Sequence, residues 1–315
     1  VETVVALPEA TERVLAALGE PSKPSKPWCR VGRGFAWNMQ PYGRARWFQD
    51  QGSAWVGFEE DGTLVVRAGV PDVGGGQAAA LARIAAEVLG ISPERVVVHF
   101  GDSALTPLTG GTFATRQLYI SGNAVLKASR ELKEQISPVA ADLLEAREED
   151  LDFADNGVSV VGAPDRRVGF DRVVAECRRR GVPTWRLSTF EAEAAPFDPT
   201  TGRGKTFPDF TYGCHGIEVE VDTETGQVRV LKAVACHDVG RAINPQSVEG
   251  QIQGGAAMGL GQALMEEVVL QGGQNLTTLF AHYEMPTAAD LPDISPIVLE
   301  SGEGKGPFNA RGVGE

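Results

Sequence analysis

Apolar residues recur at helical spacing in several stretches of the 315-residue chain. In residues 77–89, Leu81, Ile84 and Val88 fall on one helical face, and Gly90 follows as a stop signal. The same pattern predicts a set of helices over residues 8–18, 77–89, 117–147, 171–180 and 245–265. Within the third of these, the proline at position 138 leaves a break open, because a proline inside a helix removes a backbone hydrogen bond.

Alternating and continuous apolar runs predict the strands. Residues 54–58 and 63–67 flank an Asp-Gly turn and form a hairpin, and residues 216–221 and 227–230 form a second, half-exposed hairpin. A buried strand over residues 95–100 and a hairpin centred on residues 155–157 complete the pattern. Helices and strands that do not alternate strictly are typical of an α+β fold.

The chain is long enough for about two domains, and we expect two mixed α/β subdomains. Residues 1–30 hold an N-terminal helix and a proline-rich linker, residues 31–180 form the first subdomain, and residues 181–315 form the second. Both ends look cut, since the chain starts on Val1 instead of Met and stops on Glu315. We therefore expect a portion or one split chain of a longer subunit.

Charge narrows the class of partner. The chain carries 42 acidic and 29 basic residues, a formal net charge of −13. An excess of negative charge repels phosphate backbones and anionic lipid, so neither nucleic acid nor a membrane is an expected partner. No apolar run approaches the roughly 18 residues of a membrane span.

The four cysteines are too few for a disulfide framework, which favours a reducing cytoplasm. Two of them precede a histidine, in the pairs Cys214-His215 and Cys236-His237. Both pairs lie in strand-like segments, where adjacent side chains point to opposite faces, so each pair offers only one ligand to a common centre. A structural metal is therefore not expected.

Glycine and small polar residues gather in segments that could carry chemistry. Residues 69–77 lead from a strand into a helix, where free amides can bind an anion or simply make a tight turn. Residues 109–116 either start a helix, with Thr112 or Thr115 as N-cap, or aim backbone amides at an oxyanion.

Two further segments are rich in glycine. Residues 248–261 are helical in pattern although each internal glycine costs about 1 kcal/mol relative to alanine. Their glycines indicate either tight helix packing or close approach of the backbone to another group. Residues 304–315 end on Glu315, which is either a solvated end or a general base held on a glycine-rich loop.

In their order along the chain, these segments resemble the molybdenum-cofactor subunit of the xanthine dehydrogenase and aldehyde oxidase family, the molybdenum hydroxylases. The resemblance covers nearly the whole chain, beginning part-way into that subunit. Five motifs carry it, namely residues 69–91, residues 101–124, residues 251–267, residues 283–292 and the closing Gly312-Val313-Gly314-Glu315.

The resemblance implies a molybdenum-cofactor-binding domain that holds a molybdopterin dinucleotide. Family members hydroxylate a C–H carbon of an N-heterocycle or aldehyde with oxygen from water, and Glu315 occupies the position of their general base. The positions that would contact the cofactor are Gly74, Gly75, Gly76, Gln77, Thr112, Phe113, Ala114, Thr115, Met258 and Gly259. Many members have glutamine where this chain has Gly75 and Met258, so the side-chain hydrogen bonds expected there are missing.

The resemblance also implies partners. Electrons would leave through [2Fe-2S] and FAD partners that this chain does not encode, and the N-terminal half of the molybdenum subunit would complete the cofactor site. Arg44 and Trp47 lie in a segment that borders the substrate channel in relatives, where an arginine beside aromatics suits a planar heterocycle. A solvated strand edge with Trp47 packed inward is the alternative for this segment. The expected substrate is a purine or similar N-heterocycle. Aldehyde, nicotinate or carbon monoxide oxidation, or a non-catalytic scaffold without cofactor, are the alternatives.

Overall fold

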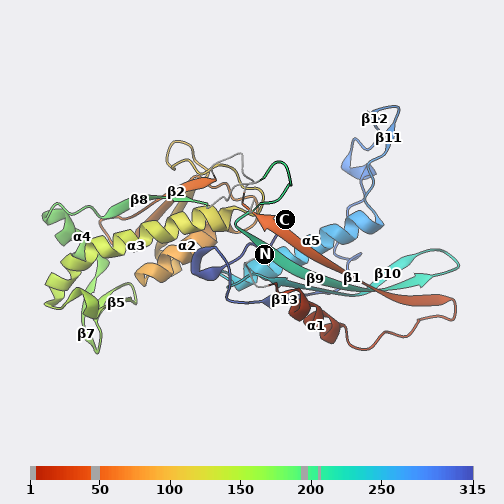
Figure 1. Cartoon of the computed structure of the whole chain (residues 1–315), viewed down its shortest axis with the longest axis horizontal. Coiled ribbons are helices and arrows are strands. Elements are labelled where there is room, and N and C mark those ends of the chain that lie inside the picture. Colours follow the sequence, from red (N-terminus) through yellow and green to blue (C-terminus); the bar gives the residue numbers. More distant parts are fainter. Residues whose placement is uncertain (1–4, 44–49, 193–197, 205–206, 315) are drawn as a thin grey trace. The chain divides into compact units, whose positions relative to one another are not determined.

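The computed structural model describes residues 5–43, 50–192, 198–204 and 207–314. Its contacts divide these residues into two compact units that interleave along the sequence. Unit 1 holds the described part of residues 1–40 together with residues 211–301, and unit 2 holds the described part of residues 41–210 together with residues 302–314. Figure 1 labels the elements of both units.

This division differs from the contiguous stretches expected from the sequence, with boundaries at residues 30 and 180. Strand β1 (Cys29–Tyr42) pairs with β9 (Asp209–Asp222), so the start of the chain joins a late segment. Strand β8 (Trp185–Glu191) pairs with β2 (Gln51–Phe58), which carries it back to unit 2. Both assignments, of β1 and of β8, follow from strand pairing between distant segments, which the local sequence pattern does not encode.

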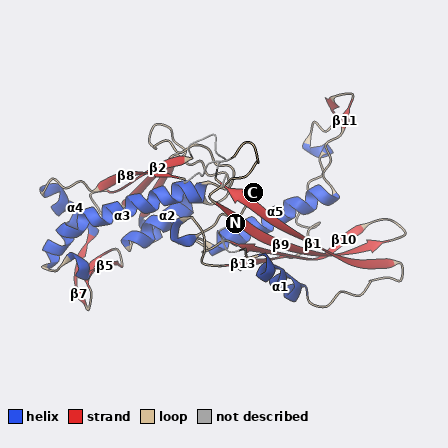
Figure 2. Cartoon of the chain, viewed as in Figure 1, coloured by secondary structure: helices blue, strands red, loops and turns tan. Residues whose placement is uncertain are grey.

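Unit 1 is built on a four-stranded sheet in the order β1-β9-β10-β13. Strand β10 (Val228–Asp238) is antiparallel to β9 and parallel to β13 (Ile294–Leu299), and Figure 2 shows the long strands β1, β9 and β10 as red arrows. The predicted hairpin over residues 216–230 is confirmed, and both of its strands are longer than the sequence pattern indicated.

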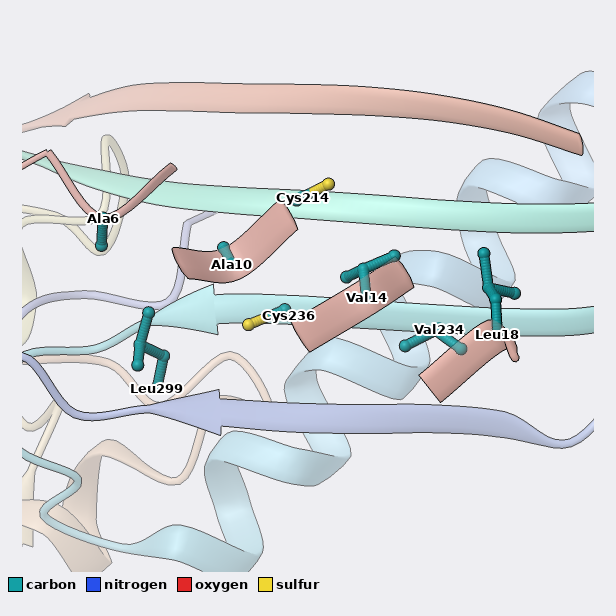
Figure 3. Close-up of a cluster of buried hydrophobic side chains, with 8 residues drawn as sticks. All are labelled: Ala6, Ala10, Val14, Leu18, Cys214, Val234, Cys236 and Leu299. Carbon is teal, nitrogen blue, oxygen red and sulfur yellow. The ribbon is translucent and has the colours of Figure 1, made fainter. Parts of the chain in front are cut away.

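Helix α1 (Leu7–Leu18) packs on one face of this sheet, and α5 (Pro245–Leu264) lies on the other (Figure 3). The side chains that α1 buries, Ala10, Val14 and Leu18, recur every four residues, which is the spacing of one helical face. The buried cluster they complete consists of Ala6, Ala10, Val14, Leu18, Cys214, Val234, Cys236 and Leu299. Beyond α5, the short strands β11 (Leu270–Gln271) and β12 (Gln274–Asn275) form a hairpin.

Unit 2 is built on the sheet β4-β3-β2-β8. Strands β2 and β3 (Leu64–Ala68) form the predicted antiparallel hairpin, and β4 (Val96–Phe100) joins β3 in parallel after α2 (Gln77–Leu89). Strand β4 is only partly buried, so the expectation of a fully buried strand is wrong, because β4 lies at the edge of the sheet.

Helix α3 (Gln117–Leu144) packs on α2, β2 and β8, and it runs unbroken through Pro138. The buried side chains of Ile136 and Val139 on either side of Pro138 hold the helix in place across the missing hydrogen bond. A three-stranded sheet follows, formed by β5 (Leu151–Ala154), β6 (Gly157–Val160) and β7 (Ala163–Gly169), and α4 (Phe170–Arg179) packs against β7 and α3.

Mixed sheets with helices packed on them confirm the α+β fold class. Among the described residues, none of the helices is both long and apolar enough to cross a membrane.

Candidate functional site

Unit 2 brings together three of the glycine-rich segments that are far apart in the sequence. The Thr112 hydroxyl donates to the backbone oxygen of Pro71 at 2.6 Å, which ties the loop of residues 109–116 to the turn of residues 69–77. The same loop contacts the end of the chain, because a Cβ placed on Gly312 would lie 2.1 Å from Cγ2 of Thr115. Three candidate segments therefore meet in one compact unit.

A buried ion pair fixes the loop of residues 109–116. The Arg116 guanidinium donates to Oδ1 of Asp50 through Nε at 2.8 Å and Nη2 at 2.6 Å, and it donates to the Gly111 backbone oxygen at 2.9 Å. Both side chains are almost fully buried. Arg116 also takes the N-cap position of α3, where no side chain caps the helix. The interpretation of Thr112 or Thr115 as the N-cap is therefore wrong.

The backbone of this loop is held in an unusual conformation. Ala114 and Thr115 have φ angles of 52° and 51°, a left-handed region that residues with a Cβ seldom adopt. The Ala114 backbone oxygen accepts the Gly43 N–H at 3.0 Å. Strained conformations of this kind persist where surrounding contacts impose them, and they cluster at ligand-binding sites.

The segment that leads to Glu315 is anchored by a second buried charge. Arg311 is fully buried and donates from Nε to Oδ2 of Asp209 at 3.3 Å. The Tyr42 hydroxyl donates to the same oxygen at 2.5 Å and accepts the Lys305 N–H at 3.2 Å. Burial, and secondly the adjacent Asp209 carboxylate, raise the pKa of Tyr42, so its hydroxyl stays protonated and keeps donating.

The glycine turn before α2 is organised around a carboxylate of the chain itself. Asp72 Oδ1 accepts the N–H groups of Gly74 at 3.0 Å and Gly76 at 3.3 Å, and Oδ2 accepts that of Ala78 at 3.3 Å. Gly74 and Gly76 have φ angles of 103° and 74°, which explains why these two positions are glycine. Asp72 thus occupies backbone donors that an external phosphate would need.

Gln77 presents the remaining polar group of this turn. Its Oε1 is buried, and no hydrogen-bond partner is found for it in the part of the chain that the structure describes. A Cβ placed on Gly75 would lie 2.6 Å from Nε2 of Gln77, so the glutamine amide fills the space that a side chain at position 75 would take.

In unit 1, several glycines of α5 are not covered by other described residues. A Cβ placed on Gly250, Gly254 or Gly259 would meet no described atom within 4 Å, and Met258 is 70% exposed. Helix packing inside the described chain therefore does not account for these glycines. Gly261 differs, since its Cβ would lie 2.6 Å from Cδ of Pro286.

Three predicted site residues cannot be placed. Arg44, Trp47 and Glu315 lie outside the described residues. Conversely, the sequence pattern did not single out four charged residues that the structure places at the site, namely Asp50, Asp72, Asp209 and Arg311. Only Asp72 gave a local signal, since an aspartate two residues before a glycine is typical of a side-chain turn.

The chain is similar to known proteins over most of its length. The sequence profile of the molybdopterin cofactor-binding domain matches residues 10–292. The large subunit of nicotine 6-hydroxylase from Paenarthrobacter nicotinovorans is 33% identical over 88% of this chain and 33% of its own length. The molybdenum-binding subunit PaoC of aldehyde oxidoreductase from Escherichia coli K12 is 32% identical over 84% of this chain and 34% of its own length.

Solved structures of molybdenum enzymes and related oxidoreductases also superpose on nearly the whole chain. Quinoline 2-oxidoreductase from Pseudomonas putida 86 superposes with a TM-score of 0.80 at 28% identity, over 98% of this chain and 39% of that one. A Cu,Mo-CO dehydrogenase superposes with a TM-score of 0.77 at 22% identity, over 98% of this chain and 38% of that one, and shows the fold alone.

The chain belongs to the molybdopterin cofactor-binding domain family, which confirms the resemblance seen in the sequence. It spans about a third of the length of the curated relatives it matches. Each unit, taken by itself, offers one observation that fits a bound group of this kind: in unit 2 the unsatisfied Oε1 of Gln77, and in unit 1 the α5 glycines at which an added Cβ would meet no described atom. The amides of Gly74 and Gly76 do not add to that fit, because Asp72 already accepts them.

Proposed function

We propose that this chain is part of a molybdenum hydroxylase that oxidises a C–H bond of a purine or similar N-heterocycle. The observation that carries the proposal is the family match over residues 10–292. The names of the relatives support an N-heterocycle, since they include nicotine, hypoxanthine and quinoline enzymes beside aldehyde and carbon monoxide enzymes.

The residues proposed to hold the cofactor are those of two loop segments, within residues 69–77 and 109–116, and of α5. In the loops they are Gly74, Gly75, Gly76, Gln77, Thr112, Phe113, Ala114 and Thr115, and on α5 they are Met258 and Gly259. At the glycine turn, the Gln77 amide is the group with hydrogen-bonding capacity to spare. When bound, the molybdenum cofactor supplies the redox centre that takes electrons from the substrate.

Glu315 is proposed as the general base. A carboxylate in this role must accept a proton from a position close to the substrate, with little freedom to move. The anchoring of Arg311 on Asp209, four residues before Glu315, supports this by restricting the segment that leads to it. Arg44 and Trp47 are proposed to border the substrate.

The proposed partners are the remainder of the molybdenum subunit, which would complete the cofactor site, and [2Fe-2S] and flavin components that carry electrons away. That this chain spans about a third of its curated relatives supports the first of these. The relatives' names, which describe subunits of larger enzymes, support the second.

Metal and pterin analysis tests the function. The chain is co-expressed with the remainder of the subunit and the redox components, and the purified complex is assayed for molybdenum, for pterin and for oxidation of purines, nicotinate and aldehydes. We expect close to one molybdenum per complex and turnover of an N-heterocycle. A folded complex without molybdenum would instead support the scaffold alternative.

Glu315→Gln in the same complex tests the base. The substitution removes the proton acceptor and keeps the size of the side chain, so we expect unchanged molybdenum content and a loss of turnover of about 10²- to 10⁴-fold. Wild-type turnover in a variant with full molybdenum content would remove Glu315 from this role.

A further inference from the structure

Two histidines from neighbouring strands of unit 1 converge on each other. His215 lies on β9 and His237 on β10, where they pair with Ala235 and Gly213 respectively. They are therefore diagonal neighbours on one face of the sheet. Their Nε2 atoms are 2.7 Å apart, and their ring centroids are 5.0 Å apart.

The cysteines beside them point the other way. Cys214 and Cys236 are direct partners across the same two strands, and both are buried in the cluster beneath α1 (Figure 3). Because side chains alternate along a strand, each Cys-His pair sends its thiol to the α1 face and its imidazole to the α5 face. The alternation thus separates two thiols from two imidazoles, and of these four side chains the two imidazoles share the α5 face.

The contact between the rings requires a lone pair on one of them. At 2.7 Å one Nε2 donates a hydrogen and the other accepts it, so at least one ring is neutral. Burial lowers the pKa of His215, which favours the neutral form. Neutral imidazole is the form that binds metal ions, and Zn²⁺, Cu²⁺ and Ni²⁺ all accept it.

The separation is also close to that of two imidazoles on one ion. With metal–nitrogen bonds of about 2.0–2.1 Å and an angle between about 90° and 109° at the metal, the two nitrogens lie about 2.9–3.4 Å apart. For an ion to replace the shared hydrogen, the two nitrogens have to separate by a few tenths of an ångström and the rings have to turn so that both lone pairs face the ion.

We propose that His215 and His237 form a two-histidine site for a divalent transition-metal ion of the Zn²⁺ or Ni²⁺ type. Water completes the coordination, because no group of three or more histidine, cysteine or acidic side chains is placed to hold a metal among the described residues. Such a site is open, so it binds more weakly than a four-ligand structural site and ties β9 to β10 when occupied.

The four histidines of the chain allow a matched test. Binding of Ni²⁺ and of Zn²⁺ to the purified chain is measured by titration calorimetry and by the shift in Tm that each ion produces. We expect one saturable site per chain. Either His215→Ala or His237→Ala weakens it at least tenfold, whereas the control variants His99→Ala and His282→Ala keep the wild-type affinity.

Two further measurements keep the outcome clear. His237→Gln retains hydrogen bonding with less change of volume, so it separates loss of a ligand from loss of the fold, and circular dichroism without metal monitors folding in every variant. Cys236→Ser is expected to bind as the wild type does. No saturable binding to the wild type, or wild-type affinity in the folded His215→Ala and His237→Ala variants, would overturn the proposal.

Discussion

Asp50 and Arg116 form a deeply buried ion pair in the candidate site. The guanidinium is bound on one side by the carboxylate and on another by the Gly111 backbone oxygen, so the pair holds the loop as well as neutralising two charges. Removing one partner of such a pair destabilises the folded state strongly, since it leaves an uncompensated charge buried.

Asp50→Ala should therefore lower the free energy of unfolding by about 3–5 kcal/mol, because it leaves the buried Arg116 charge unpaired. Denaturant unfolding of the chain measures the change. Arg13→Ala is the matched control, since it breaks an exposed pair with Glu9 whose loss should cost about 0–1 kcal/mol. Equal losses in the two variants would contradict this assignment.

Glu220 makes the stability of unit 1 sensitive to acid. The backbone N–H of Ser25 in the first place, then Arg229 and the Ser25 hydroxyl, lower the pKa of Glu220 to about 2. Between that value and the ordinary glutamate pKa near 4.5, the unfolded chain takes up a proton that the folded chain does not. The contribution of Glu220 is therefore complete above this range and is lost as the pH falls through it.

Glu220→Gln should accordingly flatten the fall in stability between about pH 4.5 and pH 2. Tm is measured across this range for the variant, for the wild type and for Glu12→Gln, which removes an exposed carboxylate from α1. The expected result is a smaller slope in the Glu220 variant alone. A slope equal to that of the wild type would show that its hydrogen bonds do not persist in solution.

Among the elements, the turn that leads into α2 shows how a segment expected to bind an anion can be satisfied internally. Residues 69–77 have the glycines and the helix start that such a site needs. Asp72 supplies the negative charge from within the chain, and its position also suits the helix dipole of α2.

Asp72→Ala should remove the carboxylate that accepts the Ala78 N–H in the first turn of α2, at a cost of about 0.5–2 kcal/mol of stability. It should also free the amides of Gly74 and Gly76, so inorganic phosphate should raise the Tm of the variant more than that of the wild type, at matched ionic strength. Asp102→Ala is the control, because the Asp102 carboxylate accepts the Ala104 N–H in a similar way but in a turn that does not begin a helix. An equal response to phosphate in all three proteins would show that the amides remain closed.

The bounds of a helix or strand could be predicted where residues such as glycine stand at its ends. Glycines at positions 76 and 90 bound α2, and the predicted range of that helix is correct. The partners of β1 and β8 were not predictable, because a strand's own sequence does not say which distant strand it meets. The site follows the same division, since the glycine segments are visible in the sequence whereas the buried contact of Arg311 with Asp209 spans 102 positions.

At the scale of the whole molecule, each unit is assembled from segments distant in the sequence. In unit 1, α1 covers Cys214 and Cys236, and in unit 2 the buried Cys177 lies on α4. The thiols therefore report on the two units separately.

Removing residues 1–20 should uncover the two thiols beneath α1 without affecting the one on α4. Titration with an aromatic disulfide reagent under native conditions should show two fast-reacting cysteines in the truncated chain, identified by mass spectrometry as Cys214 and Cys236. Cys177 should stay slow, as in the full chain. Fast reaction of Cys177 as well would show that unit 2 depends on α1.

The pairing of β1 with β9 has a consequence for the order in which the protein acquires its structure. On a ribosome, β1 emerges long before its partner, and unit 2 can collapse around β2, β3 and α3 while β1 still has an unpaired edge. Closing a loop of this size is slow compared with forming local contacts. Pairing of β1 with β9 should therefore be a late step of folding, and until then the unpaired edge of β1 is a site at which a chaperone could bind.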